Sequence, residues 1–294
     1  MNYPTIKQLR YFIALVDHNH FGKAAQSCFV SQSAFSVAIK ELESVLDSQL
    51  VDRTNKSVTV TNIGNETYSK AKEIIHELSK LVEISQGNKM PLTGKLSLGI
   101  IPTIAPFLLS KFVFKLQKSY PELELFLHEG MTLNIYEKLI SGELDVILIA
   151  LPYALKNVEF ISLFNDKFNL AYKQNSKWIN PQKIIHPKDE SVLLLEDGHC
   201  MRDHALAACN FKNLDKISRY SASSVLTLVE MVKSDIGVTY LPELSLDSYL
   251  IKQSGLKIQE LENSQFREIG LVWRKGSSRV DEFKLLGEFI KSHK

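Results

Sequence analysis

Apolar and polar positions alternate at helical spacing through the first part of the chain. In residues 6–19 the apolar side chains step by three and four, which predicts a helix. A second helical stretch, "FGKAAQSCF", follows, and after a turn at Val30 and Ser31 comes a third, "SQSAFSVAIKELESVL". Ser31 is a suitable N-cap for that third helix. The apolar side chains that share one of its faces are Phe35, Ile39, Leu42 and Leu46.

The pattern then changes to a hairpin and a long helix. "LVDRTNKSVTVT" alternates and predicts two short strands around a polar turn. A helix is expected from about Asn62 to Gly87, with a heptad-like seam at Tyr68, Ala71, Ile75, Leu78 and Val82. Such a seam packs either on the helix's own domain or on a second copy. The length of the helix and its charged remainder favour a two-stranded coiled coil.

From Lys95 onward, apolar strands such as "KLSLGII", "DVILIAL" and "VLLLED" alternate with helical stretches. This alternation is typical of an α/β domain with a mainly parallel sheet. We therefore expect an α+β chain in two parts. The first part comprises a three-helix and hairpin domain (1–61) and a linker helix (62–90), and the second is an α/β domain (91–294).

Composition narrows the class of protein. The 294 residues are 45% apolar, carry a net charge of only +2 and hold three cysteines. No apolar run reaches the length of a membrane span, and the N-terminus lacks the apolar core of a signal peptide. We expect a cytoplasmic protein with no membrane partner, whose cysteines are thiols at rest and form no disulfide framework.

Two helices joined by a tight turn, the second rich in Ser and Gln, suit a DNA-reading helix-turn-helix. Residues 1–60 carry six Lys/Arg and five Asp/Glu, a weak electrostatic footprint, so non-specific DNA affinity should be modest. A solvated helix would show the same pattern. The expected DNA contacts are Gln32, Ser33, Ser36 and Lys40 on the third helix, and Arg53 at the hairpin, toward a phosphate.

The segment "FGKAAQSCFVSQSAFSVAIKELE" resembles the winged helix-turn-helix of LysR-type transcriptional regulators. The resemblance covers the whole chain. It implies a winged DNA-binding domain, a linker helix and a regulatory domain like the periplasmic binding proteins. That domain would have two subdomains, I at about 91–165 with 268–294 and II at about 166–267. It also implies a homotetramer, a dimer of dimers, that binds promoter DNA and RNA polymerase and is not an enzyme.

A second stretch, "LLLEDGHCMRDHALAAC", narrows the resemblance to the peroxide-responsive members of that family, as do "GIIPTIAPFLL", "LFLHEGMT" and "REIGLVWRKGS". The likeness implies that hydrogen peroxide oxidises Cys200, which then forms a disulfide with Cys209 and activates antioxidant genes until a thiol reductant resets it. The positions around the reactive sulfur are Thr103, Thr132, His199, Arg202 and Arg267. The DNA-reading helix departs from the pattern at Ala34 and Phe35, where Thr and Leu are expected, which puts the operator preference in doubt.

The chemistry of this stretch is consistent with the residues themselves. A thiol reacts with peroxide as its thiolate, which a helix N-terminus and nearby arginines stabilise. Threonine hydroxyls can donate to peroxide oxygens. Nine residues of helix rise ~13.5 Å, whereas a disulfide joins Cα atoms roughly 4.4–6.8 Å apart. If the Cys200 helix is intact when reduced, a disulfide must remodel it, and that change would be the readout.

Other interpretations remain open. Cys28 is expected to be a buried structural thiol. His204 lies four residues after Cys200 on one helix face, but the opposite placement of Cys209 argues against a metal site, and no cofactor is expected. The chain could instead be a LysR-type regulator responding to a metabolite in the inter-subdomain cleft, or a thiol peroxidase.

Overall fold

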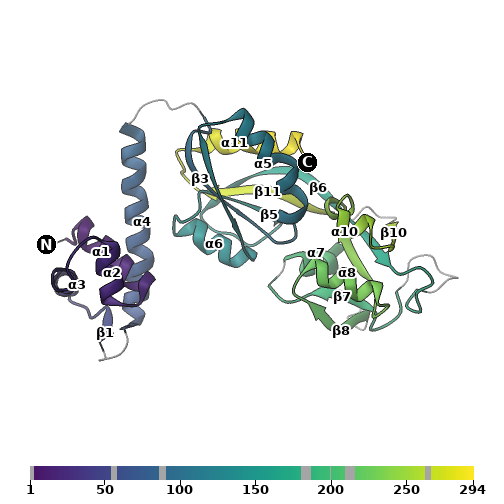
Figure 1. Ribbon diagram of the computed structural model, residues 1–294, viewed down its shortest axis with the longest axis horizontal. Coiled ribbons are helices and arrows are strands. Elements are labelled where there is room, and N and C mark those ends of the chain that lie inside the picture. The colour runs from purple at the N-terminus through teal and green to yellow at the C-terminus, as the bar shows by residue number, and fades with distance from the viewer. Residues whose placement is uncertain are drawn as a thin grey trace. The chain divides into compact units, whose positions relative to one another are not determined.

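The computed structural model of the 294-residue chain consists of two separate units, Met1–Lys89 and Met90–Lys294. Figure 1 shows both units along the chain. The structure describes residues 3–53, 58–85, 91–179, 187–198, 200–208, 216–261 and 266–294. Within these ranges no helix is both long enough and apolar enough to cross a membrane.

The first unit begins with three helices, α1 (Ile6–His18), α2 (Phe21–Ser27) and α3 (Gln32–Leu46). Thr5 and Gln8 form a capping box at the start of α1. The expected cap of α3 is confirmed, because the Ser31 hydroxyl accepts a hydrogen bond from the Ala34 amide at 3.2 Å. The expected inner face of α3 is also confirmed, since Phe35, Ile39 and Leu42 are fully buried. Cys28 caps the end of α2 and is half-buried rather than buried.

A hairpin of β1 (Val51–Arg53) and β2 (Val58–Val60) follows, with Val51 opposite Val60. The chain then enters α4 (Asn62–Ser85). Thr61 anchors this entry: its hydroxyl accepts from the Gly64 amide at 3.0 Å and donates to the Gln49 carbonyl at 2.9 Å. The start of α4 is therefore fixed against the hairpin.

The structure corrects the first part of the seam expected on α4, whereas Leu78 lies outside the core of the N-terminal unit and the Val82 side chain lies outside the described residues. Ala71 is buried in the core of the N-terminal unit, and Tyr68 and Ile75 pack against the same core, where α4 contacts α1. The Tyr68 hydroxyl donates to the Asp17 carboxylate of α1. Burial, followed by this bond to Asp17, raises the pKa of Tyr68. These side chains were expected to face a second copy. Apolar spacing identifies a face that is buried but not the partner that buries it.

The second unit, Met90–Lys294, corresponds to the regulatory domain that the family resemblance implies, and we call it the regulatory unit. It holds a seven-stranded sheet in the order β10-β6-β11-β5-β3-β4, with β9 also paired to β6. Figure 1 shows α5, α6 and α11 around β3, β5 and β11, and α7 and α8 beside β7 and β8. The strands of this unit are β3 (Gly94–Ile100), β4 (Leu123–Glu129), β5 (Val146–Leu151), β6 (Val158–Tyr172), β7 (Val192–Leu195), β8 (Ile217–Ala222), β9 (Thr239–Pro242), β10 (Lys257–Glu260) and β11 (Phe266–Arg274). The helices are α5 (Ala105–Ser119), α6 (Thr132–Ile140), α7 (Cys200–Ala208), α8 (Val225–Lys233), α9 (Glu243–Leu246), α10 (Tyr249–Lys252) and α11 (Val280–Ser292).

The 15-residue strand β6 joins two lobes of this unit. Its residues 158–167 pair with β11, and its last residues pair with β9 and β10. We call the part with β3, β4, β5, β11, α5, α6 and α11 the first lobe, and the part with β7 to β10 and α7 to α10 the second lobe. A site that draws on both lobes is thus built around a continuous strand.

The expectation of a mainly parallel sheet was wrong. Among the named strands of the described residues, the β3–β4, β3–β5 and β7–β8 pairs are parallel, whereas β11 lies antiparallel between β5 and β6, and β9 and β10 lie antiparallel to β6. An apolar run shows that both faces of a strand are covered, but it does not report strand direction. The antiparallel character comes largely from β11, which enters the sheet late in the sequence.

We predict that Gly64→Ala destabilises the N-terminal unit by about 2 kcal/mol, because close packing at this position leaves no room for a methyl group. An added Cβ would lie 2.2 Å from the Leu50 carbonyl oxygen and 2.8 Å from Val60 Cγ1. Hydrogen exchange of peptides within residues 5–53 of the full chain measures the change. Asn65→Ala, on the next and exposed helical position, is the control and should change stability by less than about 0.5 kcal/mol. Equal protection in the two variants would contradict the packing argument.

Candidate functional site

Cys200 lies in a small cavity between the two lobes of the regulatory unit. The empty space between its lining atoms is about 160 Å³ with open solvent included, and none of it is wide enough for a water molecule as the side chains stand. Its lining residues are Ile101, Pro102 and Thr103 from the β3–α5 turn, Met131 and Thr132 at the start of α6, and Gly198 and Cys200 at the start of α7. Cys200 is only 5% exposed. The space is tight, so a small reactant would enter with a slight displacement of a side chain such as the half-exposed, flexible Met131.

Three helices begin around this cavity. Thr132 and Cys200 are the first residues of α6 and α7, and Thr103 lies two residues before α5. Neither α5 nor α6 has a side-chain cap, so their first amide groups are not occupied by capping side chains. Helix N-termini carry partial positive charge, and three of them together favour an anion between them.

The hydroxyl of Thr132 is buried without a hydrogen-bond partner in the described structure. The residue is 1% exposed and lines the cavity beside Cys200. A buried hydroxyl with no partner costs roughly 1–3 kcal/mol. Such a group therefore suggests a molecule that binds it transiently.

Thr103, in contrast, is held by Arg267. The guanidinium donates from Nη1 to the Thr103 hydroxyl oxygen at 2.8 Å and from Nη2 to the Thr103 carbonyl at 3.0 Å. It also forms a buried ion pair with Asp166, with Nε and Nη2 at 3.0 and 2.9 Å from Oδ2. Arg267 does not line the cavity but lies behind Thr103. Sequence reasoning missed Asp166. Asp166 is the direct cross-strand partner of Arg267 between β6 and β11, so only a correct prediction of the strand register would have found it.

The other expected site residues are placed differently. The Arg202 side chain turns away from the cavity, with Nε 3.0 Å from the Asp197 carboxylate and Nη1 3.3 Å from the Leu195 carbonyl. Both arginines expected to act on the thiol are thus paired with carboxylates. His199 and Cys209 lie outside the described residues. His204 Nε2 lies 3.2 Å from the Pro152 carbonyl, and within the described ranges no three His, Cys, Asp or Glu side chains gather to hold a metal.

The backbone conformation just before α7 requires a glycine at position 198. Its φ is +95°, a conformation that other residues rarely adopt, and an added Cβ would lie 3.2 Å from Met131 Sδ. Sequence reasoning noted Gly198 only as the residue after which the Cys200 helix begins, and it did not single out Met131. A glycine two residues before Cys200, where its helix begins, was the available signal.

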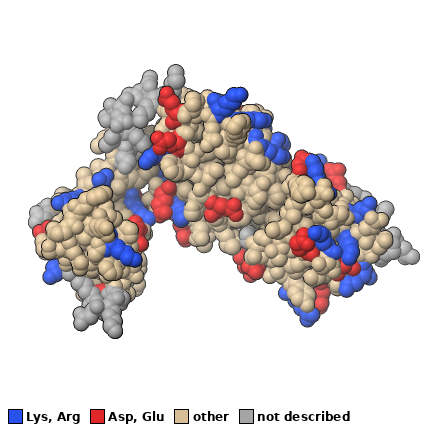
Figure 2. Space-filling view, in the orientation of Figure 1, with Lys and Arg blue, Asp and Glu red and all other residues tan. Residues whose placement is uncertain are grey.

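On α3, the expected DNA contacts Gln32, Ser33 and Lys40 are exposed, and Ser36 is half-buried. Gln32, Ser36 and Lys40 are four residues apart and so lie on one face, away from the buried face. Arg53 ends β1, but its side chain is outside the described part of the chain. On the side of the N-terminal unit shown in Figure 2, basic groups are interspersed with acidic ones. Among its described residues, this side of the unit therefore shows no continuous basic patch.

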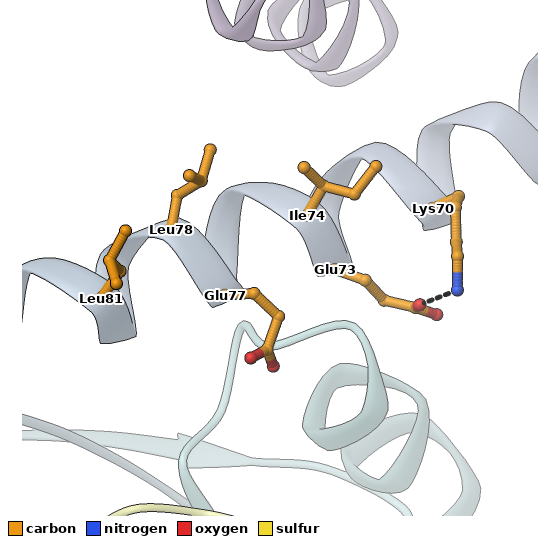
Figure 3. Close-up of a pocket in the computed structure, with 6 residues that line it drawn as sticks. All are labelled: Lys70, Glu73, Ile74, Glu77, Leu78 and Leu81. Atoms are coloured by element: carbon orange, nitrogen blue, oxygen red, sulfur yellow. Dashed lines mark hydrogen bonds and ion pairs between the residues drawn. The ribbon is translucent and has the colours of Figure 1, made fainter.

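A different face of α4 carries exposed and half-exposed apolar side chains. We call Ile74, Leu78 and Leu81 on this face the α4 stripe. Ile74 is 42% exposed, Leu81 is 63% exposed, and Leu78 lies between them at helical spacing. Figure 3 shows these three side chains on one side of the helix, with Glu73, Glu77 and Lys70 on the other. Lys70 and Glu73 form an ion pair at 2.6 Å. This arrangement resembles one half of a helix–helix interface.

Comparison with known families agrees with both units. Residues 6–65 match the family described as "Bacterial regulatory helix-turn-helix protein, lysR family", and residues 90–294 match the "LysR substrate binding domain". The chain belongs to the LysR family. It is therefore a LysR-type DNA-binding transcriptional regulator, and the two-part fold expected from the sequence is confirmed.

Relatives within this family carry more than one name. The chain is 36% identical over 290 residues to the HTH-type transcriptional regulator EstR of Acinetobacter baylyi, covering 98% of this chain and 96% of that protein. It is 33% identical over 289 residues to the DNA-binding transcriptional dual regulator OxyR of Escherichia coli K12, covering 98% and 95%.

Solved structures of OxyR share the fold. Full-length OxyR from Pseudomonas aeruginosa, as a cysteine-to-aspartate variant, matches with a TM-score of 0.81 and 30% identity, covering 99% of this chain and 96% of that one. An OxyR cysteine-to-serine variant from Corynebacterium glutamicum, described as bound to H2O2, matches with a TM-score of 0.64 and 29% identity, covering 100% and 95%. The resemblance to OxyR inferred from the sequence is confirmed.

We predict opposite stability effects for the same substitution at the two threonines. Thr132→Val replaces an unpaired buried hydroxyl with a methyl group and should raise the free energy of unfolding by about 1 kcal/mol. Thr103→Val removes an acceptor of a buried guanidinium and should lower it by about 2 kcal/mol. Urea unfolding followed by tryptophan fluorescence reports on the regulatory unit alone, because both tryptophans, Trp178 and Trp273, lie there. Equal effects at the two positions would contradict the assigned hydrogen bonds.

Proposed function

We propose that this LysR-type regulator senses hydrogen peroxide through Cys200 and transmits its oxidation to promoter binding. The observation that carries the proposal is the cavity in which the Cys200 thiol meets two buried threonine hydroxyls, one of them unpaired, where three helices begin. A space this tight has no room for a metabolite and favours a very small polar molecule that a slight side-chain movement admits. The similarity to proteins named OxyR supports the choice of peroxide.

The reaction uses the chain's own groups. The Cys200 thiolate attacks one peroxide oxygen, an S–O bond forms as the O–O bond breaks, and the sulfur loses two electrons. The other oxygen leaves as hydroxide and takes a proton to become water. The hydroxyls of Thr103 and Thr132 orient the peroxide, and the three helix N-termini stabilise the negative charge on the thiolate and on the leaving oxygen.

A second step converts the oxidation into a change of shape. The Cys209 thiolate attacks the sulfenic sulfur of Cys200, a disulfide forms, and a second water is released. In the reduced chain, α7 is helical from Cys200 to Ala208, most of the interval between the two cysteines. Because a disulfide needs Cα atoms roughly 4.4–6.8 Å apart, the bridge requires α7 to unwind or move. A thiol reductant returns the pair to thiols.

The readout is DNA binding by α3. LysR-type regulators bind DNA through the helix-turn-helix unit, which belongs to the first unit of this chain. Two copies joined through the α4 stripe would hold two α3 helices at a fixed half-site spacing. We place the chain in a homotetramer that responds to peroxide by changing promoter contacts and access of RNA polymerase.

The two cysteines should separate the steps of the mechanism. Cys200→Ser should abolish the reaction with peroxide, whereas Cys209→Ser should react at near wild-type initial rate but stop at a sulfenic acid or beyond, because no bridge forms. Mass spectrometry of the full chain after one equivalent of peroxide should find a Cys200–Cys209 linked peptide in the wild type alone. Hydrogen exchange across residues 200–208 and binding to an operator selected from random duplexes should change only in the wild type.

The same experiment distinguishes the alternatives. A wild-type chain that stays fully thiolic at stoichiometric peroxide would overturn the proposal and favour a metabolite-responsive regulator. Rapid repeated turnover of peroxide with a thiol reductant, without a change in operator binding, would favour a thiol peroxidase. A bridge that forms with no change in exchange over α7 would remove the structural readout.

The α4 stripe predicts a dimer that charged substitutions weaken. Replacing both Ile74 and Leu81 with Asp should raise the dissociation constant for self-association at least about tenfold, because each apolar side chain loses more than about 1 kcal/mol of burial. Light scattering across a dilution series measures this. Ser69→Asp, exposed on another face of α4, is the matched control and should leave assembly unchanged. A concentration-independent mass of one chain in the wild type would refute dimerisation through this helix.

A further inference from the structure

We propose that Asp166 is a positioning residue for the reaction of Cys200, acting through Arg267 and Thr103. The inference rests on the proposed function and extends it to a residue that does not line the cavity. Asp166 is 2% exposed and Arg267 is 1% exposed, so this ion pair is excluded from water. Its role follows from where each hydrogen bond is directed.

Asp166 fixes the orientation of the guanidinium. The two residues are direct cross-strand partners between β6 and β11, and one carboxylate oxygen, Oδ2, accepts from both Nε and Nη2 of Arg267. A guanidinium is planar and presents its donors in a fixed fork. Holding the Nε edge of this fork therefore determines where Nη1 points, which is at the Thr103 hydroxyl.

The fixed guanidinium in turn prevents the Thr103 hydroxyl proton from pointing toward Arg267. Arginine can only donate hydrogen bonds, so the Thr103 oxygen must accept from Nη1. That leaves the Thr103 proton free to point elsewhere, and in the described structure this hydroxyl donates to no other group. Because Thr103 lines the cavity with Cys200, the available direction for its proton includes the space where peroxide would sit. Arg267 thus orients a donor for the departing oxygen.

Asp166 also joins the two lobes at this point. Its second oxygen, Oδ1, accepts from the Leu244 amide in the first turn of α9 at 2.8 Å. α9 belongs to the second lobe, whereas Thr103 belongs to the first. One carboxylate, which accepts three hydrogen bonds, therefore ties the position of the second lobe to the threonine that lines the Cys200 cavity.

Asp166→Asn tests this role, because it keeps the shape of the side chain and removes its charge. In the full chain, the second-order rate of Cys200 oxidation by hydrogen peroxide should fall about tenfold, since a donor that is aligned for the transition state is lost. Alkylation of Cys200 by iodoacetamide, which needs no hydroxyl donor, should fall by much less. The ratio of the two rates separates positioning from a general loosening of the site, which would raise both. Asp166→Glu, which keeps the charge, should restore most of the peroxide rate.

Two controls keep the test specific. Glu159→Gln removes a carboxylate from the same strand pair, where Glu159 accepts from Trp273 Nε1 at 3.3 Å, and should leave both rates unchanged. In a double-mutant cycle, Asp166→Asn should slow oxidation no further in a Thr103→Val background, because both changes act on one donor. Additive losses would show that Asp166 does not act through Thr103.

The outcomes also separate this inference from the proposed function. A wild-type Cys200 that does not react with peroxide would overturn the function and the inference together. A reactive wild type with an equally reactive Asp166→Asn variant would overturn only the inference. Should Asp166→Asn fail to fold, the double variant Asp166→Asn, Arg267→Gln removes both buried charges at once, which proteins tolerate better than a lone buried charge. A wild-type rate ratio in that variant would equally overturn the role of Asp166.

Discussion

A guanidinium group that is removed from water needs a negative charge nearby and acceptors for its hydrogen bonds. In the regulatory unit this requirement determines the structure where the two lobes meet, which we call the junction. Arg267 meets it with one carboxylate, one hydroxyl and one carbonyl, contributed by β6 and by the β3–α5 turn. Those acceptors fix the turn that forms one wall of the Cys200 cavity. The ion pair also lies where β6 passes from the first lobe to the second. The neutralisation of Arg267 and the connection between the lobes therefore depend on each other.

Because both nearby arginines form ion pairs, the partial positive charge around the Cys200 thiol comes from backbone amides rather than from side chains. Arg202 and Arg267 are each paired with a carboxylate, so each contributes little net field at the sulfur. The starts of α5, α6 and α7 remain, and their amide groups are fixed in direction by the helices that follow. Dipoles held by the fold need no reorganisation when charge develops on an oxygen.

The sequence was sufficient to predict most of the local structure. The helices of the N-terminal unit, the Ser31 cap and the strand and helix around Cys200 follow from spacing and capping. Interactions between distant segments did not follow. The partner of the Tyr68, Ala71 and Ile75 face, the direction of β11 and the pairing of Asp166 with Arg267 all depend on which segments meet in space. Residue types 101 positions apart carry no pattern that a single sequence reveals.

Helix α4 has different surroundings along its length. Its first turns are fixed to α1 and to the hairpin by Ala71, by the Tyr68–Asp17 bond and by the close approach at Gly64, whereas its exposed stripe begins at Ile74. Helix α3, which we propose reads DNA, and the stripe are thus parts of one rigid arm. If two such arms cross along the stripe, a change of a few degrees in their crossing angle becomes a displacement of several ångströms at the α3 helices. DNA, whose half-sites are set by a helical repeat of about 34 Å, would register that displacement as a loss or gain of fit.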